Sequence, residues 1–208
     1  GQNTIIDGDS SSVALTVDEV TTALDDMAGS TYFLTGLEVP MPVALAGARH
    51  AKELGMITAL NPSPLPEEPM GDLSYIDYLF INEVEGRYIE GLAPDDDLDE
   101  RALAQKVIDT YHVGCVVMTL GEKGSCALTA DGEYVTAPAT HVDKVANTAG
   151  AGDGFMAATV ANLVWGKSLG EAMEWAGKYA ALSVTIDGTI PAYRPLDEVN
   201  AFIESLGE

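Results

Sequence analysis

Apolar and polar positions alternate between two patterns along this chain. Short apolar runs typical of buried strands occur at residues 31–37, 56–60, 78–81 and 115–120. Before and between these runs, apolar residues recur at helical spacing, at residues 16–27, 40–54 and 98–111. Strands and helices in alternation predict βαβ units, and therefore a parallel sheet covered by helices.

The pattern changes after residue 120. Apolar runs at 125–129 and 133–137 flank Ala130-Asp131-Gly132, whose Asp-Gly pair is typical of a hairpin turn, so we expect an antiparallel edge to the sheet. Mostly apolar helices are predicted at 156–165 and 169–184, and a first strand within 1–9. Residues 1–208 are therefore expected to form a single doubly wound, Rossmann-like α/β domain with flanking helices.

A glycine-rich turn, Asn147-Thr148-Ala149-Gly150-Ala151-Gly152-Asp153-Gly154-Phe155, runs straight into the predicted helix at 156–165. Its three glycines can adopt positive φ and let a ligand approach the backbone, while the first N–H groups of a helix carry partial positive charge. Phosphate is the natural ligand of such a site. Asp153 lies among these donors, where a carboxylate can accept a proton from an incoming hydroxyl, so the turn indicates a kinase.

Two other glycine-rich motifs do not match the spacing of these glycines. The dinucleotide-binding fingerprint requires glycine where Phe155 stands, and a Walker A loop ending at Gly166-Lys167-Ser168 requires glycine at Ala161. A helix N-terminus whose glycines only form a tight turn, with Asp153 as its cap, stays open on this turn alone.

A second polar cluster follows the strand predicted at 78–81. Asn82 and Glu85 are three positions apart at a helix start and therefore share a face. Amide and carboxylate oxygens suit a hydrated magnesium ion that accompanies a nucleoside triphosphate. N-capping by Asn82 is an alternative that is compatible with this role.

The charge balance adds a constraint on partners and environment. The 208 residues include 33 acidic and 10 basic side chains, a formal net charge of −23, which argues against a nucleic acid partner. Such a surface repels itself in dilute buffer and is screened in concentrated salt, so we expect a halophilic protein of a salt-rich cytoplasm, with an ordinary acidic protein as the alternative. No apolar run has bilayer length and no signal peptide is evident, so a membrane partner is not expected.

Several motifs carry a resemblance to one family. The glycine-rich turn resembles the Asp-Thr-x-Gly-Ala-Gly-Asp signature of the ribokinase-like (PfkB) sugar and nucleoside kinases, with Asn147 in place of the first Asp. Asn82-Glu83-Val84-Glu85 resembles the family's Asn-x-x-Glu motif, and Asn61-Pro62-Ser63-Pro64 its Asn-Pro-Ala-Pro. The chain is closest in pattern to the ribokinases.

The resemblance starts at Gly1 but covers only about the C-terminal two thirds of the family pattern. In the family, the part not matched supplies the opening strands, a sugar-binding motif and the lid. We therefore expect the N-terminal part of the fold and the lid to be missing, and either a companion N-terminal segment or a homo-oligomer, because a partial sheet exposes apolar surface.

The resemblance implies ATP-dependent phosphoryl transfer to a sugar hydroxyl, with magnesium. It implies that Asp153 is the general base, that the anion hole comprises Gly150, Ala151 and Gly152, and that Glu38 contacts the sugar together with Asp153. Asn82 and Glu85 would organise the magnesium ion. The implied nucleotide contacts are Asn82, Thr119, Leu120, Gly121, Glu122, Lys123, Gly124, Gly152, Asp153 and Gly177.

The resemblance also implies potassium as a candidate activator. The implied ligands are Asn147, Ala149, Ser183, Ile186, Gly188 and Ala192. A neutral amide at position 147 still offers an oxygen to potassium but removes one charge from the site.

Two alternatives to a sugar kinase stay open. One is a non-catalytic nucleotide-binding or assembly module derived from this fold, because the unmatched segment and the residues Asn147 and Ala149 depart from the family pattern. The other is a kinase of a nucleoside or a sugar acid, because most acceptor-selecting residues belong to the unmatched part.

Overall fold

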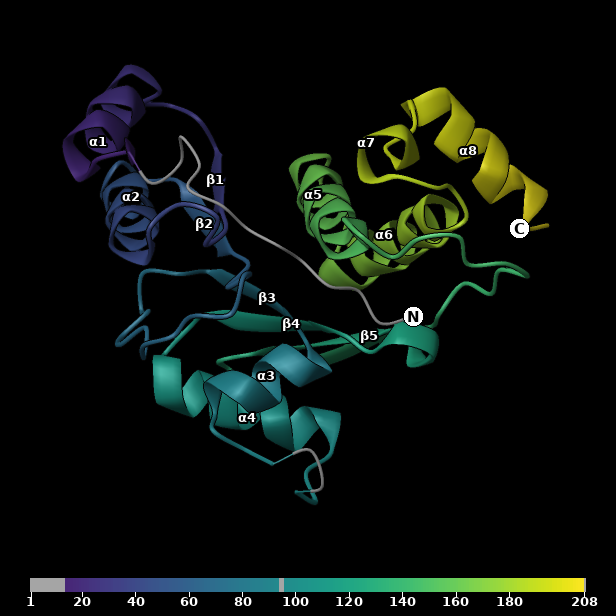
Figure 1. The fold of residues 1–208 in the computed structure, drawn as a ribbon, viewed down its shortest axis with the longest axis horizontal. Coiled ribbons are helices and arrows are strands. Elements are labelled where there is room, and N and C mark those ends of the chain that lie inside the picture. Colours follow the sequence, from purple (N-terminus) through teal and green to yellow (C-terminus); the bar gives the residue numbers. More distant parts are fainter. Residues whose placement is uncertain (1–13, 94–95, 208) are drawn as a thin grey trace.

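The computed structural model describes residues 14–93 and 96–207. Within them, a six-stranded sheet is flanked by helices on both faces (Figure 1). The strand expected within 1–9 lies outside the described residues.

The sheet follows the order of the sequence: β1 (Tyr32–Thr35), β2 (Ile57–Leu60), β3 (Tyr78–Asn82), β4 (Cys115–Thr119), β5 (Ser125–Thr129) and β6 (Tyr134–Ala137). The first four strands are parallel, whereas β5 runs antiparallel to β4 and β6 antiparallel to β5. The predicted parallel sheet and its antiparallel edge are both confirmed.

Three helices cover one face: α2 (Met41–Glu53), α3 (Glu83–Ile89) and α4 (Glu100–Tyr111). Alternate strand residues such as Leu79 and Val116 point to this face and form one buried core with Ala48 of α2 and Leu103 of α4. A further helix, α1 (Val17–Asp26), packs on the outside of α2 through a small cluster of Leu24, Ala51 and Met56.

The other face is covered by α5 (Ala151–Val164) and α6 (Leu169–Val184). The intervening strand residues Phe80, Val117 and Ala127 form a second core there with Phe155 and Met173. Helices on both faces confirm the doubly wound α/β class.

Three features at the C-terminal side differ from the prediction or were not predicted. Helix α5 begins at Ala151, five residues before the predicted start, because Gly150 is its left-handed N-cap and the following glycines are already helical. The short helix α7 (Thr189–Ala192) and α8 (Leu196–Ser205) follow α6 without having been predicted. Apolar residues at helical spacing, Leu196, Val199 and Ile203, were the available signal for α8.

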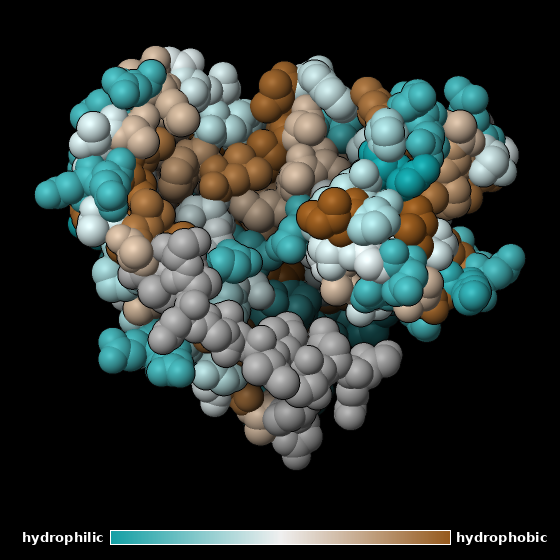
Figure 2. All heavy atoms as spheres, turned by 45° about the horizontal axis from the view of Figure 1, so that its top comes forward, coloured by the Kyte–Doolittle hydropathy of each residue, from teal (hydrophilic) through white to brown (hydrophobic). Residues whose placement is uncertain are grey.

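The two sides of the molecule leave a hollow between them, with hydrophobic atoms gathered on its walls (Figure 2). Because the carboxyl ends of parallel strands meet at the same edge of a sheet, the loops after β1 and β2 lie together there, facing the N-terminus of α5. Over the described ranges, no helix has the length and apolar character needed to cross a membrane.

Candidate active site

Gly150 fixes the start of α5. Its φ is +79°, a left-handed conformation that favours glycine, and a Cβ there would lie 2.5 Å from both Thr189 Cγ2 and Tyr193 Oη. The Tyr193 hydroxyl donates a hydrogen bond of 3.0 Å to the Gly150 carbonyl. The turn is therefore held from outside by α7 and the residue that follows it.

The other two glycines of the turn serve different purposes. Gly152 and Gly154 lie within α5 without positive φ, so the expectation of positive φ holds for Gly150 alone. A Cβ on Gly154 would lie 2.9 Å from the Tyr179 ring, so this glycine lets α5 and α6 approach. A Cβ on Gly152 would meet nothing within 4 Å, which leaves its backbone open to a ligand.

Backbone donors at the start of α5 remain available. The Ala151 N–H donates to the Thr148 carbonyl at 3.2 Å, and the Gly154 N–H to the Gly150 carbonyl at 2.9 Å. Between them, the N–H groups of Gly152 and Asp153 have no acceptor among the described residues. Together with the helix dipole, these two donors can hold an anionic group at the N-terminus of α5.

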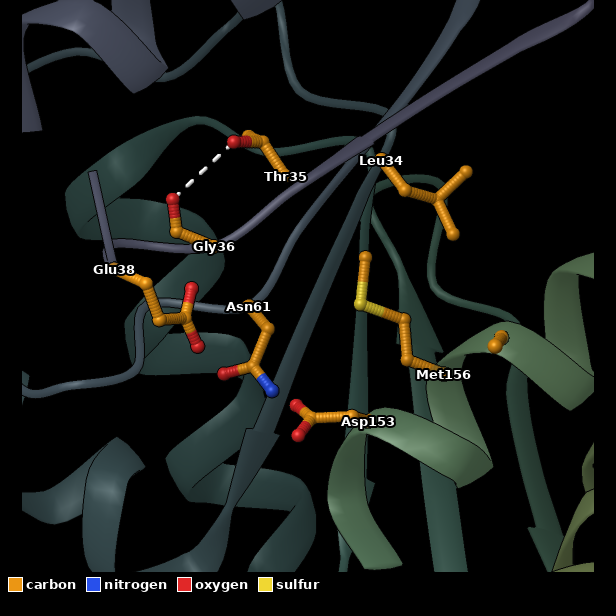
Figure 3. A pocket seen from close by; sticks show the side chains of 8 residues that line it. Leu34, Thr35, Gly36, Glu38, Asn61, Asp153 and Met156 are labelled. Carbon is orange, nitrogen blue, oxygen red and sulfur yellow. Dashed lines mark hydrogen bonds between the residues drawn. The ribbon is translucent and has the colours of Figure 1, made fainter. Parts of the chain in front are cut away.

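A cavity of about 250 Å³ opens beside these donors (Figure 3). Loop residues after β1 and β2 form one wall and α5 forms the other. The lining residues are Leu34, Thr35, Gly36, Glu38, Asn61, Asp153, Met156 and Ala157. Glu38 and Asp153, predicted to contact the same sugar, therefore line the same cavity.

This larger cavity has a polar and an apolar part. The carboxylates of Glu38 and Asp153 lie on one side, and the Leu34 and Met156 side chains on the other (Figure 3). A Cβ at Gly36 would collide with the Glu38 carboxylate, so the absence of a side chain at position 36 lets Glu38 fold back over the strand end.

A smaller cavity, of about 50 Å³, lies on the other side of Asn61. The ends of β3 and β4 and the first turn of α5 surround it. It is lined by Asn61, Phe80, Ile81, Asn82, Glu85, Thr119, Gly152 and Phe155. The two cavities share Asn61, and the adjacent residues Gly152 and Asp153 line one cavity each.

Asn82 and Glu85 form a complete capping box at the start of α3. The Asn82 N–H donates to Glu85 Oε2 at 2.7 Å, and the Glu85 N–H donates to Asn82 Oδ1 at 2.8 Å. Burial raises the pKa of the Glu85 carboxyl, the Asn82 N–H lowers it, and the charge of Asp153 raises it further. Capping and a place at the small cavity therefore coexist, and a partly buried carboxylate here suits a divalent cation.

The predicted nucleotide loop reaches the small cavity only through Thr119. The chain then forms a 3-10 helix, Gly121–Lys123, closed by a hydrogen bond of 2.8 Å from the Leu120 N–H to the Gly124 carbonyl. Gly121 and Gly124 both have positive φ, and a Cβ on Gly124 would collide with the Ala137 carbonyl. Glycine is therefore required at position 124 because the loop packs closely against β6.

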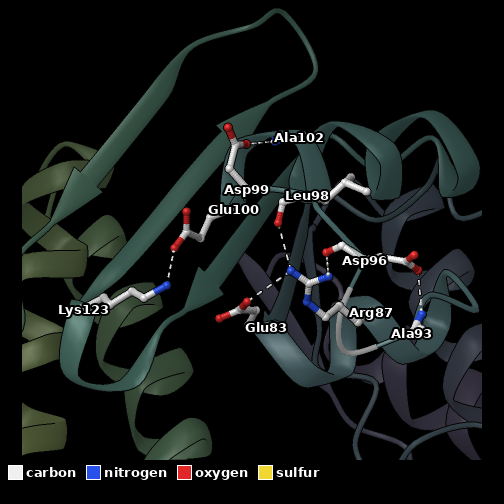
Figure 4. A network of polar contacts seen from close by, with 9 residues as sticks. All are labelled: Glu83, Arg87, Ala93, Asp96, Leu98, Asp99, Glu100, Ala102 and Lys123. Carbon is white, nitrogen blue, oxygen red and sulfur yellow. Dashed lines mark hydrogen bonds and ion pairs between the residues drawn. The ribbon is translucent and has the colours of Figure 1, made fainter.

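Two cations near this loop have partners in the protein (Figure 4). Lys123 Nζ donates to Glu100 Oε1 at 2.8 Å, so its side chain is directed to α4 and not to either cavity. Arg87 donates to the Asp96 and Leu98 carbonyls at 3.0 and 2.9 Å, and lies 3.4 Å from Glu83 Oε1.

The remaining predicted residues lie outside the two cavities. Gly177 lies on α6, where an added Cβ would be 3.8 Å from the Pro138 carbonyl oxygen. The two potassium segments do lie side by side, since the Asn147 N–H donates to the Val184 carbonyl at 3.2 Å. The Asn147 side-chain oxygen accepts from the Ala149 N–H at 2.9 Å.

Asn61 begins the Asn61-Pro62-Ser63-Pro64 motif but was not predicted as a site residue. It follows the buried strand β2 directly and lines both cavities. Its place at the carboxyl end of a parallel strand, where α/β proteins bind ligands, was the available signal.

Comparisons with known proteins show to which family the chain belongs. The family description "pfkB family carbohydrate kinase" matches residues 6–195. The deoxyribokinase of Salmonella typhi is 31% identical over 197 residues, covering 93% of this chain and 62% of that protein. The chain thus spans somewhat less than two thirds of the length of this relative.

Solved structures show the same fold. The ribokinase of Thermotoga maritima superposes with a TM-score of 0.79 at 27% identity, covering 93% of this chain and 62% of that one. Arabidopsis thaliana ribokinase, solved with ribose and ATP, gives a TM-score of 0.76 at 25% identity, covering 90% and 58%. The chain belongs to the pfkB family of carbohydrate kinases.

Proposed function

We propose that this chain transfers the γ-phosphoryl group of ATP to a sugar hydroxyl, with Asp153 as the general base. One observation carries the proposal: Asp153 lines the larger cavity while its neighbour Gly152 lines the smaller one, and both offer backbone N–H groups at the start of α5. An acceptor and a nucleotide could thus meet across a single helix N-terminus.

In this mechanism the acceptor hydroxyl gives its proton to the Asp153 carboxylate as its oxygen attacks the γ-phosphorus. The bond from that phosphorus to the β–γ bridging oxygen breaks, and ADP leaves. The oxygens of the transferring group would accept hydrogen bonds from the free N–H groups of Gly152 and Asp153. Gly150 and Ala151 would complete the same anion hole.

The nucleotide and its magnesium ion would occupy the side of the smaller cavity. The Glu85 carboxylate and the Asn82 amide oxygen fit a hydrated magnesium ion, because both are oxygen acceptors at this cavity. Such an ion would neutralise charge on the phosphates. ATP as the donor is supported by the Arabidopsis relative, solved with ribose and ATP. Residues 119–124 and Gly177 would border the nucleotide. Potassium would bind between the segments around Asn147 and Ser183.

A neutral acceptor agrees with the cavity better than a sugar acid. Glu38 and Asp153 both present carboxylates, and no lysine, arginine or histidine is found among the described lining residues. A nucleoside acceptor remains compatible with the apolar part formed by Leu34 and Met156. A non-catalytic nucleotide-binding or assembly module is the alternative, because Asn147 and Ala149 depart from the family signature.

Asp153→Asn tests the proposal. The exchange keeps size and removes the base, so nucleotide binding should stay within about twofold while turnover falls by roughly a hundredfold or more. Calorimetry with ATP and magnesium and a coupled ADP assay with ribose or deoxyribose measure the two effects. Asp143→Asn, at a fully exposed loop position, is the matched control.

Equal turnover in wild type and Asp153→Asn would exclude Asp153 as the base. Saturable nucleotide binding by a wild-type chain that forms no product with any added acceptor would favour the non-catalytic module.

A further inference from the structure

Asn61 is held at the boundary between the two cavities. Its backbone N–H donates to the Thr35 carbonyl at 3.0 Å, which ties the end of β2 to the end of β1. Asn61 lines both the larger and the smaller cavity. No other residue is common to the two linings described above.

The side-chain oxygen of Asn61 lacks a partner. Asn61 Oδ1 is buried and accepts no hydrogen bond from any described residue. A buried carbonyl oxygen without a donor costs free energy, so its persistence at a cavity wall indicates that a ligand supplies the donor.

The surroundings of this oxygen restrict the kind of donor. Figure 3 shows Asn61 between the two carboxylates, with Nδ2 on the side of Asp153 and Oδ1 on the side of Glu38. Because the Nδ2 amide of Asn61 faces the Asp153 carboxylate, Asn61 Oδ1 and the Glu38 carboxylate are left as two acceptors side by side. Two adjacent acceptors suit a ligand with O–H donors, whereas phosphate and carboxylate groups bring only acceptors and negative charge.

We propose that Asn61 is a binding residue for the acceptor substrate. Its Oδ1 accepts a hydrogen bond from a hydroxyl of a neutral, polyhydroxylated acceptor, next to the Glu38 carboxylate, and so orients that molecule toward Asp153. This inference rests on the proposed function and deepens it by assigning one residue that contacts the acceptor. A role for Asn61 on the magnesium side is the competing assignment.

The Asn61 side-chain amide can report on its own ligand by NMR, without turnover. In ¹⁵N-labelled protein its NH₂ signals are identified by their loss in Asn61→Asp. Titration with ribose or deoxyribose should shift these signals together with the backbone amide of Asp153, at the same pentose concentrations. Titration with magnesium and a non-hydrolysable ATP analogue should shift the Gly152 amide and leave the Asn61 side chain nearly unchanged.

Three outcomes overturn the inference, and they are distinguishable from one another. Pentose that shifts Asp153 but not the Asn61 side chain refutes the contact. A shift of the side chain with the magnesium nucleotide alone assigns Asn61 to the metal side. If no site signal responds to any pentose while the nucleotide binds, the acceptor half of the proposed function fails, and this inference fails with it.

Asn61→Leu separates binding from structure. Leucine has a similar shape and removes the unpaired oxygen, so the melting temperature should stay equal or rise while pentose affinity falls by about tenfold and nucleotide affinity stays within twofold. Ser63→Ala, in the same loop but outside both linings, should change neither affinity. A lower melting temperature with unchanged pentose affinity would indicate a purely structural role.

Discussion

Glu85 is subject to opposing effects on its protonation. Burial and the charge of Asp153 raise the pKa of its carboxyl, while the Asn82 N–H lowers it. Glu19 has the same position in the capping box of α1 but is fully exposed, and its hydrogen bonds with Thr16 lower its pKa. Two glutamates with the same local role therefore have pKa values shifted in opposite directions, because only Glu85 borders a cavity.

Glu85→Gln should stabilise the fold at neutral pH and weaken nucleotide binding. A carboxyl whose folded-state pKa is raised destabilises the fold when ionised, and this cost disappears as the pH falls through the unfolded-state value, near 4.5. Glutamine keeps the capping box, so urea unfolding should show a gain at about pH 8 that shrinks toward about pH 4.5. Affinity for ATP with magnesium should fall about tenfold by calorimetry.

Glu19→Gln is the control for this pair. A lowered pKa stabilises the fold above the unfolded-state value and the contribution is lost as the pH falls, so the exchange should lower stability at neutral pH and leave nucleotide affinity unchanged. A stability gain in both variants would show that burial is not the cause at Glu85.

Alanine at Gly150 and at Gly152 should have different effects on stability. Gly150 has positive φ and close neighbours, so Gly150→Ala should cost about 1–3 kcal/mol. Gly152 is helical and open, so Gly152→Ala should be neutral or stabilising by up to about 1 kcal/mol, although its methyl group would obstruct the anion site. Thermal unfolding and nucleotide titration measure both; unchanged nucleotide affinity in Gly152→Ala would contradict the anion site.

Helix starts are the elements that the sequence encodes most directly. Complete capping boxes begin α1 at Thr16, α3 at Asn82 and α6 at Ser168. Each box closes within four residues, so local sequence is enough to place it. Helix α5 differs, because no side chain caps it and its start depends on Gly150 and on contacts with Thr189 and Tyr193.

Asn82→Ala and Thr16→Ala compare a cap at the site with a cap far from it. Each loses the N-cap of a full capping box, so each should cost about 1 kcal/mol in urea unfolding. Only Asn82→Ala should also weaken binding of ATP with magnesium, by about tenfold. Equal nucleotide affinity in the two variants would mean that Asn82 acts as a cap alone.

The whole molecule carries a formal net charge of −23. Self-repulsion on this scale opposes the compact state, and salt shortens its range from about 10 Å at 0.1 M to about 3 Å at 1 M. The melting temperature should therefore rise by several degrees between about 0.1 and 1 M potassium chloride.

Sodium chloride is the comparison for this salt effect. An equal rise in both salts indicates screening, and a larger rise in potassium chloride indicates binding at a specific site such as the one proposed around Asn147. A melting temperature that does not rise in either salt would contradict the high-salt interpretation of the composition.

The sequence by itself determined the alternation of strands and helices, the antiparallel edge and the local capping boxes, and it predicts a phosphate-binding turn at Gly150. These follow from spacings of two to four residues, the range over which strands alternate and helices form hydrogen bonds. The position of Asp153 in that turn was likewise readable from the chain.

Only the tertiary structure decided which residues share a cavity with Asp153. Glu38, Asn61 and Asp153 are far apart in the sequence and meet because the parallel register of β1 and β2 brings their carboxyl ends to the start of α5. The same packing directs Lys123 to Glu100 and leaves Gly177 against Pro138. Local patterns identify groups capable of chemistry, but the distances between those groups are set by the packing of the sheet against its helices.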